Sequence, residues 1–239
     1  MSKLDELIQE LCPEGVEYSC LKDCVNIMRG TRVVKSQLME TGKYPVFQNC
    51  LTPMGYYDNF NCKGKTVFII VAGAAGEIGY SFTDFWAADD CFCFVCPQNL
   101  ESRFLYHNLL NRQNFITSKV RRASIPRLAR NVVENISIPV PPLPVQREIV
   151  RILDNFTELT VELTVELTAE LTARKQQYAY YRDKLLDRPH DSTKIITIGE
   201  LGSWSGGKTP SMDNSDYWEN GTTPWITSKD MKVSTLEDT

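Results

Sequence analysis

The sequence predicts an α+β fold: a mixed-sheet domain, then a long helix able to form a coiled coil, then an incomplete second copy of the domain. Three observations carry this prediction. Short apolar runs typical of strands fill residues 16–100, one segment keeps helical apolar spacing from residue 145 to 186, and the sequence after that segment resembles the start of the chain. The expected boundaries are 1–143 for the first domain, 144–188 for the helix and 189–239 for the second copy.

The first domain is expected to begin with a helix and to continue as strands. Residues 2–11 mix charged and apolar side chains at helical spacing, with Ser2 as the N-cap and Pro13 as a stop. Beyond them, Gly, Asn and Pro divide short apolar runs, of which 66–71 and 91–96 are the clearest. These runs predict the sheet of the domain.

A helix, a basic segment and a last strand are expected to complete the first domain. Residues 103–115 have helical apolar spacing, and 136–138 are expected to form the closing strand. Between them, residues 119–130 hold five basic side chains and no acid. The run Pro-Val-Pro-Pro-Leu-Pro at 139–144 predicts a stiff, extended connector.

The charge of the chain is distributed unevenly. The formal net charge is −4, but residues 101–143 carry seven basic and two acidic side chains. Because phosphate attraction depends on nearby charge, a basic segment can bind DNA even in an acidic protein. The chain alone would bind weakly, which suggests basic partners. The alternatives for residues 119–130 are a solvated cationic face of a structural helix and a contact with an acidic partner.

The segment after Pro144 is predicted to be one long helix. It contains no Gly or Pro up to residue 186, and from Glu158 onward it carries four tetrapeptides of the form Glu-Leu-Thr-Val or Glu-Leu-Thr-Ala. A helix of about 42 residues is roughly 63 Å long, which is too long to pack against one small domain.

A second long helix is therefore expected to pack against this one. Each four-residue step turns about 400°, so the leucine stripe of the repeats advances by about 40° per repeat. A solvated low-complexity helix is the alternative. The side chains expected in the helix–helix contact are Ile149, Leu153, Phe156, Leu159, Leu163 and Leu167.

The sequence after the long helix repeats the beginning of the chain. Residues 21–30 match 198–207 at an offset of 177, and residues 44–47 match 223–226 at an offset of 179. Tandem similarity at this distance predicts two copies of one domain, the second stopping after about 45 residues.

Two glycine-rich motifs suggest nucleotide binding but lack its structural context. Residues 202–209 fit GxxxxGK[ST], yet Pro210 follows at once and no helical apolar stripe comes after it. Gly73, Gly76 and Gly79 are not spaced as GxGxxG, and a strand rather than a helix follows them. We predict a tight turn in the sheet for the second motif and no nucleotide site at either.

The sequence contains no recognisable catalytic or metal-binding constellation. Cys91 and Cys93 would face one side of a strand and Cys96 the other, with no second Cys or His pair to complete a zinc site. Val140 and Leu143 flank two prolines where a DNA amino-methyltransferase needs a polar residue and an aromatic ring. We expect no catalytic activity, no metal and no cofactor.

The cysteines and the apolar runs indicate a compartment. All eight cysteines lie within the first 100 residues, and the chain has neither an export signal nor an apolar run of membrane-spanning length. We expect reduced thiols, a cytoplasmic location and no contact with a membrane.

Taken together, these motifs resemble the specificity subunits of type I restriction-modification enzymes. Ser-Ile-Pro-Arg-Leu at 124–128 and Ile-Pro-Val-Pro-Pro-Leu-Pro-Val-Gln-Arg-Glu-Ile at 138–149 resemble the end of a recognition domain and the start of the central conserved helix. The repeats, followed by Arg-Lys-Gln-Gln-Tyr at 174–178, resemble the spacer of the subclass with tetrapeptide repeats. The motifs that resemble the body of a recognition domain are at 42–46, 55–58, 73–76 and 85–90. The resemblance covers nearly the whole chain.

The resemblance implies two DNA-reading domains held apart by paired antiparallel helices, each domain reading half of a split target. The implied partners are double-stranded DNA, methyltransferase subunits that use S-adenosylmethionine, and motor-nuclease (restriction) subunits. Here the second domain is only begun and the second helix is absent. A full target could then be read only if two chains dimerise through the spacer helix, which would give a palindromic split site.

Eight polar side chains of the first domain are predicted to contact DNA. Arginine pairs bidentately with guanine, and side-chain amides pair bidentately with adenine. A helical dimerisation scaffold that does not read DNA sequence is the alternative function. The predicted contacts are Arg29, Arg32, Gln48, Asn49, Lys119, Arg121, Arg122 and Arg127.

Overall fold

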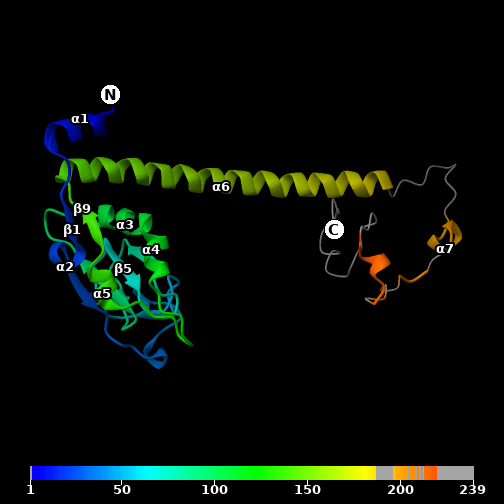
Figure 1. The fold of residues 1–239 in the computed structure, drawn as a ribbon, viewed down its shortest axis with the longest axis horizontal. Coiled ribbons are helices and arrows are strands. Elements are labelled where there is room, and N and C mark those ends of the chain that lie inside the picture. The colour runs from blue at the N-terminus through cyan, green and yellow to red at the C-terminus, as the bar shows by residue number, and fades with distance from the viewer. Residues whose placement is uncertain are drawn as a thin grey trace. The chain divides into compact units, whose positions relative to one another are not determined.

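The computed structural model describes residues 2–186, 196–203, 205–207, 209, 211 and 213–219. The chain divides into two compact units, residues 1–174 and residues 175–239. Figure 1 shows the first unit as a globular domain from which the long helix α6 extends.

The first unit contains nine short strands and six α-helices among the described residues. Its strands are β1 Tyr18–Cys20, β2 Asn26–Arg29, β3 Tyr44–Phe47, β4 Tyr56–Tyr57, β5 Thr66–Ile70, β6 Ile78–Ser81, β7 Trp86–Ala87, β8 Cys91–Val95 and β9 Ser137–Pro139. Its helices are α1 Lys3–Leu11, α2 Leu21–Cys24, the 3-10 turn η1 Lys35–Gln37, α3 Ser102–Asn111, α4 Gln113–Ser118, α5 Arg130–Glu134 and α6 Leu143–Leu186.

The strands form three sheets, and their mixed pairing confirms the α+β prediction. The main sheet has the order β2-β8-β5-β6 and is antiparallel throughout. A second sheet, β4-β3-β7, joins β3 to β7 in parallel, and β1 pairs with β9. The pairing of β1 with β9 brings residues 18–20 beside 137–139, and α6 begins shortly after this pair.

The alternation of side chains along β5 and β8 produces a core on each face of the main sheet. Val67, Ile69 and Phe92 pack with α3 in the larger cluster. Phe68 and Cys93 point to the opposite face and pack with Phe47 and Phe85 in the smaller one. As predicted, Cys91 and Cys93 share one face of the strand, whereas Cys96 packs against the other cluster.

The first helix and the glycine turn agree with the sequence prediction. The Ser2 side chain accepts a hydrogen bond from the Asp5 amide at 3.2 Å, and Asp5 bonds back to the Ser2 amide in a capping box. Residues 71–77 form the turn between β5 and β6, where Gly73 (φ +84°) and Gly76 (φ +94°) adopt left-handed backbone.

The prediction of one helix over residues 103–115 was wrong. Two helices, α3 and α4, meet at Arg112, which has φ −101° and ψ 9°. The second helix leaves the line of the first and packs on the glycine turn, where the Gln113 side chain donates to the Gly76 carbonyl at 2.6 Å. This contact with a distant turn redirects the chain, and helical spacing alone does not reveal it.

The long helix is continuous, as predicted. It begins at Leu143 with Pro144 in its first turn, where a missing amide costs nothing, and its 44 residues make it roughly 66 Å long. Only Val145, Gln146 and Glu148 are buried, near its start. In the repeats, the hydroxyl of Thr164 bonds to the carbonyl of Thr160 at 2.7 Å, and equivalent bonds recur every four residues.

The second unit contains the end of α6, the short helix α7 Ile198–Leu201 and the 3-10 turn η2 Ser215–Tyr217. The helix α7 begins 177 residues after α2, at the offset of the sequence repeat. Residues 208, 210 and 223–226 lie outside the described residues. The motif over 202–209 is therefore described only in part, and the domain boundaries stay predictions.

Candidate nucleic-acid interface

The loops at one end of the main sheet bring together segments that are far apart in the sequence. At this end β2 and β5 finish while β6 and β8 begin, because Arg29 pairs with Phe92 and Ile70 pairs with Cys91. We call this end of the sheet the loop edge. A rigid sheet thus supports several connecting loops side by side, which suits a binding surface.

The segment after β3 is fixed at the loop edge by backbone contacts. The Gln48 carbonyl accepts a hydrogen bond from the Cys91 thiol at 3.2 Å, and the Asn49 carbonyl accepts one from the Ala74 amide at 2.8 Å. A Cβ on Gly73 would lie 2.8 Å from Asn49, so only glycine permits this approach. Asn49 is exposed and Gln48 is half-buried.

The basic segment joins the same edge. The Gly73 amide donates to the Pro126 carbonyl at 3.1 Å, and the Leu128 amide donates to the Val71 carbonyl at 2.9 Å. Residues 119–129 form no helix: α4 ends before them and Lys119 is its C-cap. A cationic face on a structural helix is therefore wrong for most of this segment, and its arginines stand on a loop.

Arg29 and Arg32 lie at the adjacent end of β2. The Arg29 Nε atom donates to the Asp89 carbonyl at 2.8 Å, which holds this side chain against the chain before β8. Arg32 is exposed, and the Thr31 amide before it donates to the Ala87 carbonyl at 2.9 Å. The structure thus brings all three predicted segments to one edge, while their contact with DNA stays a prediction.

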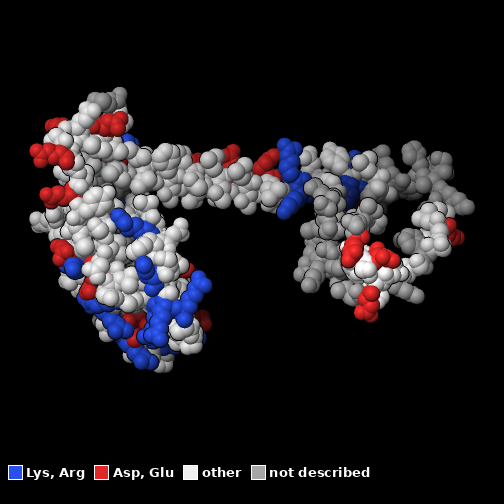
Figure 2. Space-filling view, in the orientation of Figure 1, with Lys and Arg blue, Asp and Glu red and all other residues white. Residues whose placement is uncertain are grey.

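The arginines of the loop edge differ from most other arginines of the described residues in their ion pairing. Within the described part of the chain, Arg32, Arg121, Arg122 and Arg127 form no ion pair. The arginines that do pair with an acid are Arg103, Arg130, Arg147, Arg151, Arg174 and Arg182. Figure 2 shows Lys and Arg gathered at the lower end of the domain and Asp and Glu around α1. An unneutralised patch of this kind attracts a polyanion.

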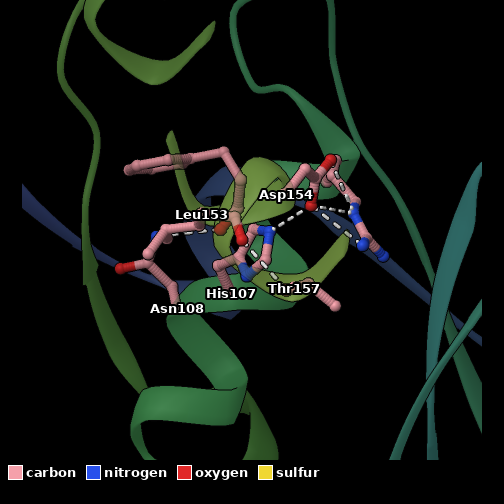
Figure 3. A network of polar contacts seen from close by, with 7 residues as sticks. His107, Asn108, Leu153, Asp154 and Thr157 are labelled. Carbon is pink, nitrogen blue, oxygen red and sulfur yellow. Dashed lines mark hydrogen bonds and ion pairs between the residues drawn. The ribbon is translucent and has the colours of Figure 1, made fainter. Parts of the chain in front are cut away.

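A second polar site attaches α6 to the domain. The Asp154 carboxylate accepts hydrogen bonds from His107 Nε2 at 2.8 Å and from Arg103 Nε at 2.9 Å, as Figure 3 shows for His107. Burial raises the pKa of Asp154, but the hydrogen bonds from Arg103 and His107 lower it more. The net result is a pKa below the usual value of an aspartate. Arg103 also lies over the Tyr80 ring, 4.8 Å from its centroid.

Sequence reasoning missed this junction. It did not single out Arg103, His107 or Asp154. The available signal was the i, i+4 spacing of Arg103 and His107, which places both on one face of α3. The acid that completes the network follows 47 residues after His107, and sequence spacing does not show such a pairing.

The first helix is fastened to α6 through Glu148. Its carboxylate is only 4 % exposed and accepts bonds from Arg151 at 2.7 Å and Lys3 at 3.0 Å. The hydrogen bonds from Arg151 and Lys3 lower the pKa of Glu148 from 4.5 to about 2. Folding therefore favours the ionised form of Glu148.

We expect the protein to become less stable as the pH falls, because Glu148 then becomes protonated. Its contribution is complete above the unfolded pKa of 4.5 and is lost as pH falls toward the folded value of about 2. Glu148→Gln should flatten the decline in melting temperature between these two values. Glu162→Gln changes an exposed carboxylate on the same helix and is the control. Equal slopes in wild type and Glu148→Gln would contradict this assignment.

No metal centre is found in the described residues, since no three His, Cys, Asp or Glu side chains gather suitably there. The thiols of Cys62 and Cys93 lie 3.1 Å apart but belong to two free cysteines. No helix in the described part of the chain is long and apolar enough to cross a membrane.

Comparisons with known proteins all point to one family. The model of the type I restriction modification DNA specificity domain matches residues 13–173. The chain is 52% identical over 103 residues to the Escherichia coli EcoR124I/EcoR124II specificity subunit, covering 41% of this chain and 24% of the relative. It is 38% identical over 196 residues to a putative type I restriction enzyme specificity subunit of Haemophilus influenzae, covering 78% of this chain and 50% of the relative.

Solved structures agree on the fold. The S subunit of a type I restriction-modification system from M. genitalium superposes with a TM-score of 0.57 at 20% identity, covering 72% of this chain and 47% of that one. The HsdS subunit from Thermoanaerobacter tengcongensis gives a TM-score of 0.52 at 19% identity, with coverage of 67% and 43%. The chain spans about half the length, or less, of these four proteins. Because the family model covers most of the chain, the protein belongs to the type I restriction-modification DNA specificity family.

Proposed function

We propose that this chain is a non-catalytic specificity subunit that reads one half of a split DNA target. It would position methyltransferase subunits, which bring S-adenosylmethionine chemistry, and motor-nuclease subunits, which bring cleavage. Membership of the specificity family supports this role. We also propose a cytoplasmic location, which fits the eight free cysteines of the chain.

The observation that carries the proposal is the set of loop-edge arginines that form no ion pair with any residue the structure describes. A rigid sheet end that offers arginines and the exposed Asn49 amide can follow the phosphates and enter the major groove. The proposed contacts are Arg29, Arg32, Gln48, Asn49, Lys119, Arg121, Arg122 and Arg127. Among them, Gln48 is half-buried and Arg29 already donates to a carbonyl, so these two would need to adjust on binding.

Removing one exposed arginine should weaken DNA binding measurably. We expect Arg122→Ala, in the complex with methyltransferase subunits, to reduce affinity for the target about tenfold and to lower the salt slope if the guanidinium meets a phosphate. Fluorescence anisotropy at several salt concentrations measures both quantities. Lys22→Ala, an exposed basic residue on α2 at the opposite end of β2, is the control. Unchanged affinity and slope would remove Arg122 from the interface.

We further propose that α6 pairs with a second long helix, which a second copy of the chain would supply. Leu159, Leu163 and Leu167 are exposed, and Phe156 is 63% exposed, so this face is unusually apolar for a solvated helix. Nearer the domain, Ile149 packs against the core and Leu153 lines an apolar groove of about 440 Å³ with α1 and α3. A second groove of about 350 Å³ continues along α6 past Phe156 and Val161.

Symmetric pairing would place two recognition domains on DNA with two-fold symmetry. The target would then be a palindrome interrupted by an unread gap.

The test of the whole proposal is to reconstitute the chain with its methyltransferase subunits and to sequence the bases that become modified. A split, palindromic motif is the expected result. Uniform or absent modification, together with DNA binding that shows no sequence preference, would instead favour a dimerisation scaffold.

A further inference from the structure

Arg121 and Arg127 form a backbone pair that closes the basic loop between them. The amide of Arg121 donates to the carbonyl of Arg127 at 2.8 Å, and the amide of Arg127 donates to the carbonyl of Arg121 at 3.1 Å. Two residues that exchange both bonds form a hydrogen-bonded antiparallel pair, whose Cα atoms lie about 5.5 Å apart and whose side chains project on one side. The two guanidinium groups therefore leave the backbone side by side.

Both stems of this loop are held by the core. Before Arg121, Val120 packs against the larger core cluster, beside Ile116 of α4. After Arg127, Leu128 is buried and its amide bonds to the Val71 carbonyl at 2.9 Å. The pair is thus formed in the free protein, and DNA does not need to assemble it.

This arrangement is unfavourable without a ligand. Like charges directly opposite each other across an antiparallel pair destabilise it. Neither Arg121 nor Arg127 has an ion pair in the part of the chain that the structure describes. A preformed pair of cations with no counter-charge among the described residues points to an anion supplied from outside.

We propose that Arg121 and Arg127 together hold a single backbone phosphate of the DNA, and so place the loop tip in the adjacent groove. This inference rests on the proposed function and assigns a division of labour within the interface. The clamp carries position and not sequence, because phosphate contacts are common to every base pair. The tip carries the sequence-dependent contact.

The side chain best placed for that contact is Ile125. It lies between the paired arginines along the loop and is 53% exposed, although it is a large apolar residue in a cationic surface. An exposed apolar side chain beside phosphate-binding groups matches the apolar contact made to the methyl group of thymine in the major groove. We assign this contact to Ile125.

The salt dependence of binding separates one shared phosphate from two independent ones. With the methyltransferase complex and its target duplex, Arg121→Gln and Arg127→Gln should each weaken binding and lower the slope of log affinity against log salt by less than 0.9. The double variant should lower the slope by about 0.9, the value for one phosphate. A decrease of about 1.8 in the double variant would show two separate contacts and overturn the clamp. An unchanged slope would overturn it as well.

The free protein provides a second readout. Because the pair repels itself, Arg121→Gln should raise the melting temperature at low ionic strength, and the gain should vanish at high salt. Lys22→Gln removes one charge from the opposite end of β2 and should show no such salt-dependent gain. A variant that is less stable than wild type at low salt would mean that Arg121 serves the fold, and the clamp would be rejected.

The tip is tested by a pair of duplexes that differ only in thymine methyl groups. Ile125→Ala should weaken binding to the thymine duplex several-fold with an unchanged salt slope, and a uracil-substituted duplex should bind wild type as weakly as the thymine duplex binds the variant. Equal binding of both duplexes by wild type would reject the assignment of Ile125. If wild type itself shows no sequence preference, the proposed function fails and not merely the clamp.

Discussion

Deleting residues 161–164, one tetrapeptide repeat of α6, is expected to shorten the unread gap of the DNA target by one to two base pairs. The four residues account for about 6 Å of helix at ~1.5 Å per residue, against about 3.4 Å per base step. If paired α6 helices set the distance between recognition domains, the original target should no longer be methylated and a more compact one should replace it.

The variant is expected to fold because the deletion preserves the local pattern of the helix. Thr160 and Thr168 each bond to a carbonyl four residues earlier. After removal of one repeat, the threonines are still four residues apart and every hydroxyl still finds its acceptor. The deletion also rotates the two parts of the helix relative to each other. Four residues turn the helix by about 400°, which is 40° beyond a full turn.

Methylation sequencing of the deletion variant is the measurement. Val161→Ala is the matched control, because it converts one repeat to the Glu-Leu-Thr-Ala form found later in the helix without changing its length. The control should retain the wild-type gap. A deletion variant that methylates the original target would mean that α6 does not act as a spacer.

The long helix and the sheet could be predicted because their signals are local. The absence of Gly and Pro over residues 145–186 predicts a continuous helix within two residues of its observed start. The two clearest apolar runs correspond to β5 and β8, each ending one residue earlier than expected. The alternation of Cys91, Cys93 and Cys96 across two faces follows from strand geometry alone.

The candidate site could be predicted only as separate pieces. Charge and residue type indicated Arg32, Asn49 and Arg122, but their convergence depends on strand register and on backbone bonds from residues 73–74 to two distant loops. The loop conformation of residues 119–129 depends in turn on the Arg121–Arg127 pair. Such pairing between chain segments carries no periodic signal in the sequence.

The largest effect on stability is expected from Gln146→Met. The Gln146 side chain is fully buried where α6 leaves the domain. Its Oε1 atom accepts from the Glu101 amide at 2.8 Å, and its Nε2 atom donates to the carbonyls of Pro141 and Asn99 at 2.7 Å and 2.9 Å. One side chain thus joins the start of α3, the proline-rich connector and α6.

Methionine has nearly the same length and volume but cannot make these bonds. Each buried backbone group left without a partner costs about 1–3 kcal/mol, so three such groups predict a loss of about 3–6 kcal/mol even after partial relaxation. That is a large fraction of the stability of a typical domain. Chemical denaturation, monitored by circular dichroism, gives the free energy of unfolding.

The matched control is Gln98→Met, which changes the same residue type in an exposed turn three residues before Glu101. Surface substitutions of this kind usually alter stability by less than about 0.5 kcal/mol. If both variants unfold at the same denaturant concentration as wild type, the hydrogen bonds of Gln146 do not fix the junction. The orientation of α6 would then depend on Asp154 with Arg103 and His107, and Asp154→Asn should show the larger loss.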